Sequence, residues 1–226
     1  ILLKISAEKA RRSKRAPKND NAAGKTQASH SVRIIPYIYS YYGEGIMNTK
    51  KERIQQLKEE KNAVILAHYY APPEVQEVAD YIGDSFYLSK LAVQLTNPVL
   101  VFCGVSFMGE SAKLLNPEKT VLMPDASADC PMAHMVDKSV IDAARAQYDD
   151  LAVVCYVNST AQIKSWSDVC VTSANAVKIV RRLPNQHILF IPDRNLGHFV
   201  AEQVPEKHFL YNEGYCPRHE FMSAEE

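Results

Sequence analysis

Side chains that can exchange protons come directly after a short apolar run in the first half of the sequence. Val64–Ala67 is expected to form a buried strand, and His68 and Tyr70 follow it. Asp84 and Ser85 stand sixteen and seventeen residues after the histidine, at the expected start of a helix. Imidazole and phenol groups suit general acid–base catalysis, and a helix start beside a strand end suits an anion. The same pattern is also typical of a strand that simply reaches the protein surface.

The arrangement recurs eighty-eight residues further along the chain. Leu151–Asn158 falls on Ala63–Tyr70 without a gap, and Ser173 falls on Ser85. The polar groups at the two strand ends differ, with Tyr156 in the place of the histidine. Identities at this offset continue over about sixty residues: Asp80 with Asp168, Lys90 with Lys178, Asn97 with Asn185, Phe102 with Phe190, Gly109 with Gly197 and Leu122 with Leu210. We interpret the chain as two copies of one α/β unit.

Alternating strands and helices must position these residues. Strands are expected at 63–67, 81–82, 99–103, 120–123 and 151–158, and helices from 47, at 74–79, 85–94, 107–115 and 139–147. Residues 125–133 have no period and predict a loop. The predicted fold is α/β, with small parallel sheets in three-layer αβα domains. The expected repeats are 47–137 and 138–226.

The repeated serines allow two interpretations. Either serine alone is explained as the N-cap of a helix. Two helix starts at equivalent places can also converge on one anion, because each supplies backbone N–H donors as well as a hydroxyl.

Residues 1–46 do not share the periodic pattern. They hold nine Lys or Arg against three Asp or Glu, which leaves seventeen against twenty-three in the remainder. We expect this segment to be disordered, and to be translated upstream sequence because Met47 is the first methionine. A basic targeting peptide is the alternative.

Composition narrows the class of protein. The acidic main body argues against a nucleic-acid partner. No apolar run reaches the roughly 18 residues needed to span a bilayer, so no membrane partner is expected. Five cysteines, an odd number without close pairing, indicate a reducing compartment and hence the cytoplasm.

The cysteines fall into two groups. Cys103, Cys155 and Cys170 lie in apolar strand patterns and are expected as core thiols. Cys130 and Cys216 each precede a proline in a loop near an equivalent strand end. Loops at strand ends are where metal ligands can converge, but zinc and iron–sulfur sites usually need three or four protein ligands. His134 and His219 could add ligands or be merely solvated, so spacing alone leaves metal binding open.

Seven blocks together resemble the quinolinate synthase family, in order from about Asn62 to His219. They are His68 to Tyr70, Pro73 to Ser85, Phe102 to Lys113, Met123 to Asp125, Ala128 to Cys130, Tyr156 to Asn158, and Gly214 to His219. The resemblance implies a transferase of NAD biosynthesis that condenses iminosuccinate (iminoaspartate) with dihydroxyacetone phosphate to give quinolinate. It implies three related α/β domains around a pseudo-threefold axis, with a 4Fe-4S cluster held by one cysteine from each domain. It also suggests a functional link to an L-aspartate oxidase or dehydrogenase.

By the same resemblance, each matching position carries a role. Cys130 and Cys216 would bind the cluster, and His68 and Tyr70 would be catalytic. The implied substrate-binding residues are His68, Ser85, Tyr156, Val157, Asn158 and Ser173.

The chain departs from the family pattern at its C-terminal end. A third repeat with a His-Pro-Glu segment and a third cysteine, near residue 300 by the 88-residue offset, is expected but absent, so we expect a truncated, poorly active copy. A non-catalytic module that binds a small phosphate or dicarboxylate is one alternative. A redox sensor that pairs Cys130 with Cys216 is another.

Overall fold

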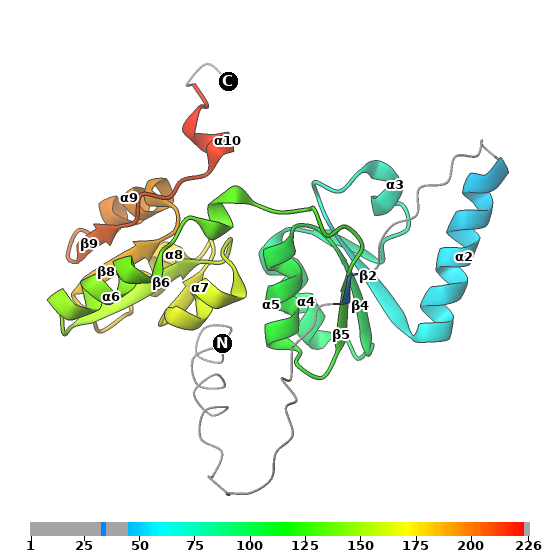
Figure 1. Ribbon diagram of the computed structural model, residues 1–226, viewed down its shortest axis with the longest axis horizontal. Helices are drawn as coiled ribbons and strands as arrows, with labels where there is room; N and C mark the ends of the chain where they lie inside the picture. Colours follow the sequence, from blue (N-terminus) through cyan, green and yellow to red (C-terminus); the bar gives the residue numbers. More distant parts are fainter. Residues whose placement is uncertain (1–32, 35–44, 224–226) are drawn as a thin grey trace, which may run out of the picture. The chain divides into compact units, whose positions relative to one another are not determined.

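The computed structural model describes residues 33–34 and 45–223, and it describes side chains from Lys50 onward (Figure 1). Of the predicted N-terminal extension, only Arg33–Ile34 and the first two residues of a helix are described. The other residues of that prediction lie outside the described part of the chain. In chain order the elements are β1 (Arg33–Ile34), α2 (Gly45–Lys61), β2 (Ala63–His68), α3 (Pro73–Gln76), β3 (Tyr81–Gly83), α4 (Ser85–Gln94), β4 (Val99–Cys103), α5 (Ser106–Leu115), β5 (Thr120–Met123), the 3-10 helix η1 (Pro131–His134), α6 (Lys138–Gln147), β6 (Leu151–Tyr156), α7 (Ala161–Trp166), β7 (Val169–Val171), α8 (Ala176–Val180), β8 (His187–Ile191), α9 (Arg194–Gln203), β9 (His208–Tyr211) and α10 (Pro217–Glu220).

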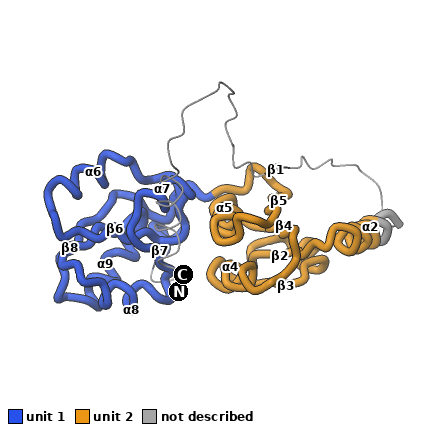
Figure 2. The backbone as a smooth tube through the Cα atoms, turned by 90° about the horizontal axis from the view of Figure 1, so that it is seen from below, with its two compact units in different colours: residues 1–17, 130–226 blue, residues 18–129 orange. Residues whose placement is uncertain are grey.

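The described chain divides into two compact units between Asp129 and Cys130 (Figure 2). Unit 2 is the N-terminal one and contains β1 to β5. Unit 1 begins at Cys130 and contains β6 to β9. The repeat boundary at 137/138 stays a proposal.

Both units hold a small parallel sheet, and apart from the extra edge strand β1 in unit 2 the two sheets have the same strand order. Unit 2 has the order β1-β5-β4-β2-β3, and unit 1, read from its other edge, has β9-β8-β6-β7. The register repeats as well, because Ala63 pairs with Val99 and Leu151 pairs with His187. Leu151 comes eighty-eight positions after Ala63, and His187 comes eighty-eight positions after Val99. The predicted α/β fold with small parallel sheets is confirmed.

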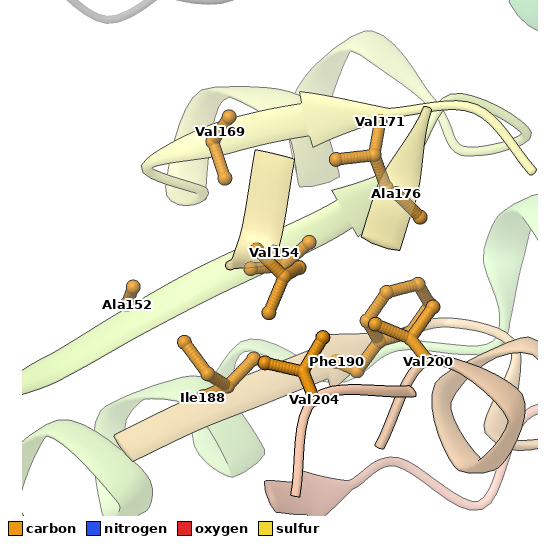
Figure 3. Packing of buried hydrophobic residues seen from close by; sticks show 10 residues of the cluster. Ala152, Val154, Val169, Val171, Ala176, Ile188, Phe190, Val200 and Val204 are labelled. Atoms are coloured by element: carbon orange, nitrogen blue, oxygen red, sulfur yellow. The ribbon is translucent and has the colours of Figure 1, made fainter. Parts of the chain in front are cut away.

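The sheet of unit 1 is covered by helices on both faces. Successive side chains of a strand point to opposite faces, so β6 serves two cores. Ala152 and Val154 pack with residues of α8 and α9, including Val200, as Figure 3 shows. Val153 and Cys155 pack on the other face with side chains of α6 and α7. This double burial explains the continuous apolar run of β6.

In each unit an aspartate that precedes one strand binds the backbone of the neighbouring strand. Asp80 precedes β3 and binds β2, and Asp168 precedes β7 and binds β6. The Asp80 carboxylate accepts a hydrogen bond from the Ile65 N–H at 2.8 Å, and its own N–H donates to the Ile65 carbonyl at 2.9 Å. Asp168 makes the same two bonds with Val153, at 2.8 and 3.0 Å. The helix α3 ends at Gln76 rather than at the predicted residue 79, because the chain must turn there to place Asp80 for its two bonds with Ile65.

No described helix is long and apolar enough to cross a membrane.

Candidate active-site residues at the strand ends

His68 ends β2 beside the turn that starts α4. It pairs in register with Gly83 on β3, and the Tyr69 N–H donates to the Gly83 carbonyl at 3.3 Å. A side chain at Gly83 would lie 2.2 Å from the Tyr87 ring, so only glycine leaves this turn tight against the strand end. The predicted neighbours His68, Asp84 and Ser85 are thus brought to one edge of the unit 2 sheet.

The tautomer of His68 follows from its hydrogen bond. Its Nδ1 accepts from the Tyr70 N–H at 3.2 Å, which leaves Nε2 to carry the proton of the neutral ring. Partial burial lowers the pKa of His68, while the charge of Asp84 opposes this shift. The neutral ring is therefore the dominant form near pH 7.

Tyr70 projects from the strand end into solvent. Its side chain is 91% exposed, and its ring lies edge-on to the His68 imidazole with the centroids 4.6 Å apart. Two proton-carrying groups thus lie side by side, and one of them is fully accessible to a ligand.

The N-cap of α4 is Asp84, and the interpretation of Ser85 as an N-cap is wrong. Asp84 accepts a hydrogen bond from the Tyr87 N–H at 2.7 Å, and Ser85 is the first helical residue. Ser85 is half-buried, and α4 is ten residues long. A hydroxyl and free backbone N–H groups at a helix start are groups of the kind that bind anions.

Tyr156 ends β6 in unit 1, at the place that His68 has in unit 2. Burial and the Asp193 carboxylate raise the pKa of Tyr156 to about 12, and the Cys216 and Cys130 groups contribute in the same direction. A hydrogen bond with the Ser173 side chain opposes the shift. Tyr156 is therefore a neutral phenol with neighbours from four loops.

The two residues after Tyr156 lie in a turn held by main-chain bonds. The Val157 N–H donates to the Val171 carbonyl at 2.8 Å, and the Ser159 hydroxyl donates to the Tyr156 carbonyl at 2.9 Å. Asn158, between them, is half-buried. This turn brings the amide of Asn158 to the same edge as Tyr156.

Ser173 does not start a helix, so that part of the prediction is wrong. α8 begins at Ala176 with Asn175 as its N-cap, and the Asn175 side chain accepts from the Thr172 N–H at 2.7 Å. Because of this turn, α8 begins three residues after Ser173. Ser173 is exposed and reaches Tyr156 instead.

Cys130 and Cys216 each precede a short helix in a loop of unit 1. Cys130 precedes η1, and its carbonyl accepts from the Ala133 N–H at 2.9 Å. Cys216 precedes α10, and its carbonyl accepts from the N–H groups of His219 and Glu220 at 3.0 and 2.9 Å. None of the five cysteines forms a disulfide. His134 and His219 are exposed, and no three ligand-type side chains gather within residues 50–223.

The chain is similar to known proteins of one family. The sequence model described as quinolinate synthetase A protein matches residues 52–226. The chain is 55% identical over 174 residues to the quinolinate synthase of Clostridioides difficile, and 55% identical over 175 residues to that of Fusobacterium nucleatum. It is 52% identical over 176 residues to that of Caldicellulosiruptor saccharolyticus. The chain belongs to the quinolinate synthase family.

The quinolinate synthase relatives are longer than the region matched here. The alignments cover 77–78% of this chain and 57–59% of the relatives. The chain thus spans less than two thirds of their length. A reductase of E-1-hydroxy-2-methyl-but-2-enyl-4-diphosphate from Plasmodium falciparum is similar with a TM-score of 0.28 and 15% identity, covering 76% of this chain and 57% of its own, which supports no argument.

Sequence reasoning missed two buried polar residues of unit 1, Asp193 and Asn212. Asp193 is buried, 5% exposed, and caps α9 through the Asn195 N–H at 3.0 Å. Asn212 is buried too, and it donates to the Met135 carbonyl at 2.6 Å. The sequence signal for Asn212 was its break with the repeat, because the residue eighty-eight positions earlier is Pro124.

Proposed function

We propose that the chain is part of a quinolinate synthase that condenses iminosuccinate with dihydroxyacetone phosphate, releasing phosphate and water to form quinolinate. The observation that carries this proposal is the convergence of the Cys130 and Cys216 loops, which the Asn212 side chain joins through its hydrogen bond to the Met135 carbonyl. This convergence occurs in a chain that shares about half of its residues with family members along the matched region.

A 4Fe-4S cluster fits the donors of unit 1. Cys130 and Cys216 are half-exposed thiols in loops, and thiolate is the ligand that such clusters prefer. They would hold two of the irons. When bound, the cluster would supply a Lewis acid that polarises a substrate oxygen. Two cysteines do not complete the ligand set, so a further ligand must come from beyond the described residues.

Proton transfer is assigned to His68 and Tyr70. The Nε2 of His68 carries a proton while Nδ1 is engaged by the Tyr70 N–H, so the ring is held in one orientation. The lowered pKa keeps the ring neutral near pH 7, so its Nε2–H can donate a hydrogen bond to a substrate oxygen during enolisation, and the ring can accept a proton only if Nδ1 releases the Tyr70 N–H. The Tyr70 hydroxyl, open to solvent, can donate one during loss of water.

Substrate binding is assigned to the other strand-end residues. Ser85 and the start of α4 suit a phosphate or carboxylate. Tyr156 and Ser173 share a hydrogen bond, and both hydroxyls can turn toward a ligand oxygen. Asn158 offers an amide donor, and Val157 fixes the backbone that presents it. Iminosuccinate hydrolyses readily, so an L-aspartate oxidase or dehydrogenase in the same cytoplasm is the proposed source.

Anaerobic reconstitution with iron and sulfide, followed by a quinolinate assay, tests this function. Brown protein that makes quinolinate supports the proposal. Colourless protein that binds dihydroxyacetone phosphate without turnover supports a small-anion binding module instead. In protein that makes quinolinate, Tyr70→Phe should leave the iron content unchanged and lower turnover sharply. Unchanged turnover would remove Tyr70 from the mechanism.

A further inference from the structure

Two loops of unit 1 carry Cys130 and Cys216. We define the Cys130 loop as residues 130–135 and the Cys216 loop as residues 212–216. They are separated by 77 residues between Met135 and Asn212, yet one side chain joins them. Asn212 donates its amide N–H groups to the Met135 carbonyl at 2.6 Å and to the Pro192 carbonyl at 3.1 Å.

We propose that Asn212 is a positioning residue that fixes the separation between Cys130 and Cys216. The inference rests on the proposed function only in assigning both cysteines to one site. The clamp itself consists of hydrogen bonds that exist without a ligand.

The Cys130 loop is rigid between the cysteine and its attachment point. The Ala133 N–H donates to the Cys130 carbonyl at 2.9 Å, and the Met135 N–H donates to the Met132 carbonyl at 3.1 Å. Met132 and Ala133 are both 1% exposed, so they anchor the loop in the unit 1 core. Holding the Met135 carbonyl therefore holds Cys130.

The Cys216 loop is equally constrained on the other side of the clamp. The Gly214 carbonyl accepts from the Arg194 N–H at 2.8 Å. A Cβ at Gly214 would lie 2.5 Å from the Pro192 carbonyl oxygen and 2.7 Å from the Asn212 amide nitrogen. The backbone thus passes so close to the clamp that no side chain fits, and Cys216 follows two residues later.

The clamp is not a requirement of the repeated fold. Apart from β1, unit 2 has the same strand order, but Pro124 stands eighty-eight residues before Asn212 and has no side-chain donor. Asn212 is 6% exposed, and a buried amide that binds two carbonyls is costly to lose. A residue peculiar to the unit that carries both cysteines is explained by their positioning.

Thiol bridging in the full 226-residue chain tests the proposal. Dibromobimane becomes fluorescent only when it alkylates two thiols, and peptide mass spectrometry identifies the pair. We expect Asn212→Leu to slow Cys130–Cys216 bridging roughly tenfold, because two buried carbonyls lose their donor. Alkylation of each cysteine by iodoacetamide should change much less, since single labelling does not depend on separation.

Lys207→Met is the matched control. Lys207 is also buried in unit 1, and its ammonium donates to the Leu183 and Asn185 carbonyls at 2.7 and 2.6 Å. This variant should lower the unfolding temperature while bridging stays at the wild-type rate. If Asn212→Leu does not fold, Asn212→Ser, which adds no bulk and is too short to reach both carbonyls, decides the question.

Wild-type bridging rates in a folded Asn212 variant would overturn the proposal, as would a wild-type chain without the bridged peptide. Failure of the proposed function looks different. A wild-type chain that bridges normally but retains no iron or sulfide contradicts the cluster assignment and leaves the clamp intact.

Discussion

Lys119 and Lys207 stand at equivalent places in the two units, and both bind one equivalent carbonyl, that of Leu95 or Leu183. Each is less than 10% exposed and donates its ammonium to two backbone carbonyls in or just after the last turn of a helix. The acceptors are Ala92 and Leu95 for Lys119, and Leu183 and Asn185 for Lys207. A buried cation at a helix C-terminus satisfies carbonyls that have no partner within the helix.

Replacing either lysine should destabilise its unit by a similar amount. Lys119→Met and Lys207→Met each leave two buried carbonyls unpaired, at a cost of about 1–3 kcal/mol in the free energy of unfolding. Urea unfolding measures this loss. Lys138→Met is the control, since its exposed ion pair with Asp142 is worth less than about 1 kcal/mol. Equal effects of all three substitutions would contradict the role of the buried ammonium groups.

Two glycines should differ in their tolerance of alanine. At Gly109 the new Cβ would meet the Met123 sulfur at 2.3 Å, a flexible group, and alanine gains about 1 kcal/mol in a helix interior. At Gly214 it would meet the Pro192 carbonyl oxygen, which belongs to the backbone. We expect Gly109→Ala to be nearly neutral and Gly214→Ala to cost about 1–3 kcal/mol. Thermal melts that rank them in the opposite order would refute this explanation.

His68 should make stability fall as the pH falls. Its pKa in the folded chain is lowered by burial, so below the ordinary value of 6.5 the unfolded chain binds the proton first. The stabilisation is present above pH 6.5 and is lost as the pH falls toward the folded-state pKa. The effect is small because the ring is partly exposed to solvent. Urea unfolding at pH 7.5 and 5.5 should show a smaller difference in His68→Gln than in the wild type.

The cysteines should differ in their rates of alkylation. Cys130 and Cys216 are partly exposed, and so are Cys103 and Cys170, which were expected to be buried core thiols. The pKa values of Cys103 and Cys170 are raised, so Cys130 and Cys216 should react with iodoacetamide first. Burial raises the pKa of Cys103 to about 11, so few of its thiols ionise at pH 8. Burial opposes ionisation of Cys155, although a hydrogen bond from Cys170 lowers its pKa. Full burial should still make Cys155 slow to react. Mass spectrometry of a labelling time course measures this order, and early labelling of Cys155 would contradict it.

Much of the fold could be predicted from the sequence, because the strand patterns and the helix signals agree with each other. β4 (Val99–Cys103) and β5 (Thr120–Met123) were predicted at their observed bounds, as apolar runs between turn residues. The offset of eighty-eight residues also holds in the strand register. Both copies also contain the same aspartate beside the strand end and the same buried lysine.

The candidate site was harder to predict from the sequence, because its loops differ between the two repeats. Ser173 aligns with Ser85, but Asn175 captures the Thr172 N–H and moves the helix start. No periodicity marks Asn212, since its importance depends on a carbonyl 77 residues away. Local chemistry and long-range acceptors are visible only once the backbone is folded.

The clamp made by Asn212 also assigns the two thiols to a single folding unit. Cys130 is the first residue after unit 2 ends, yet its loop is bonded to Asn212 of unit 1. His68 and Tyr70 belong to unit 2. Cys130 and Cys216 therefore lie in one compact unit, and His68 and Tyr70 lie in the other. Partial unfolding confined to unit 2 would abolish the acid–base pair and leave the thiol pair assembled.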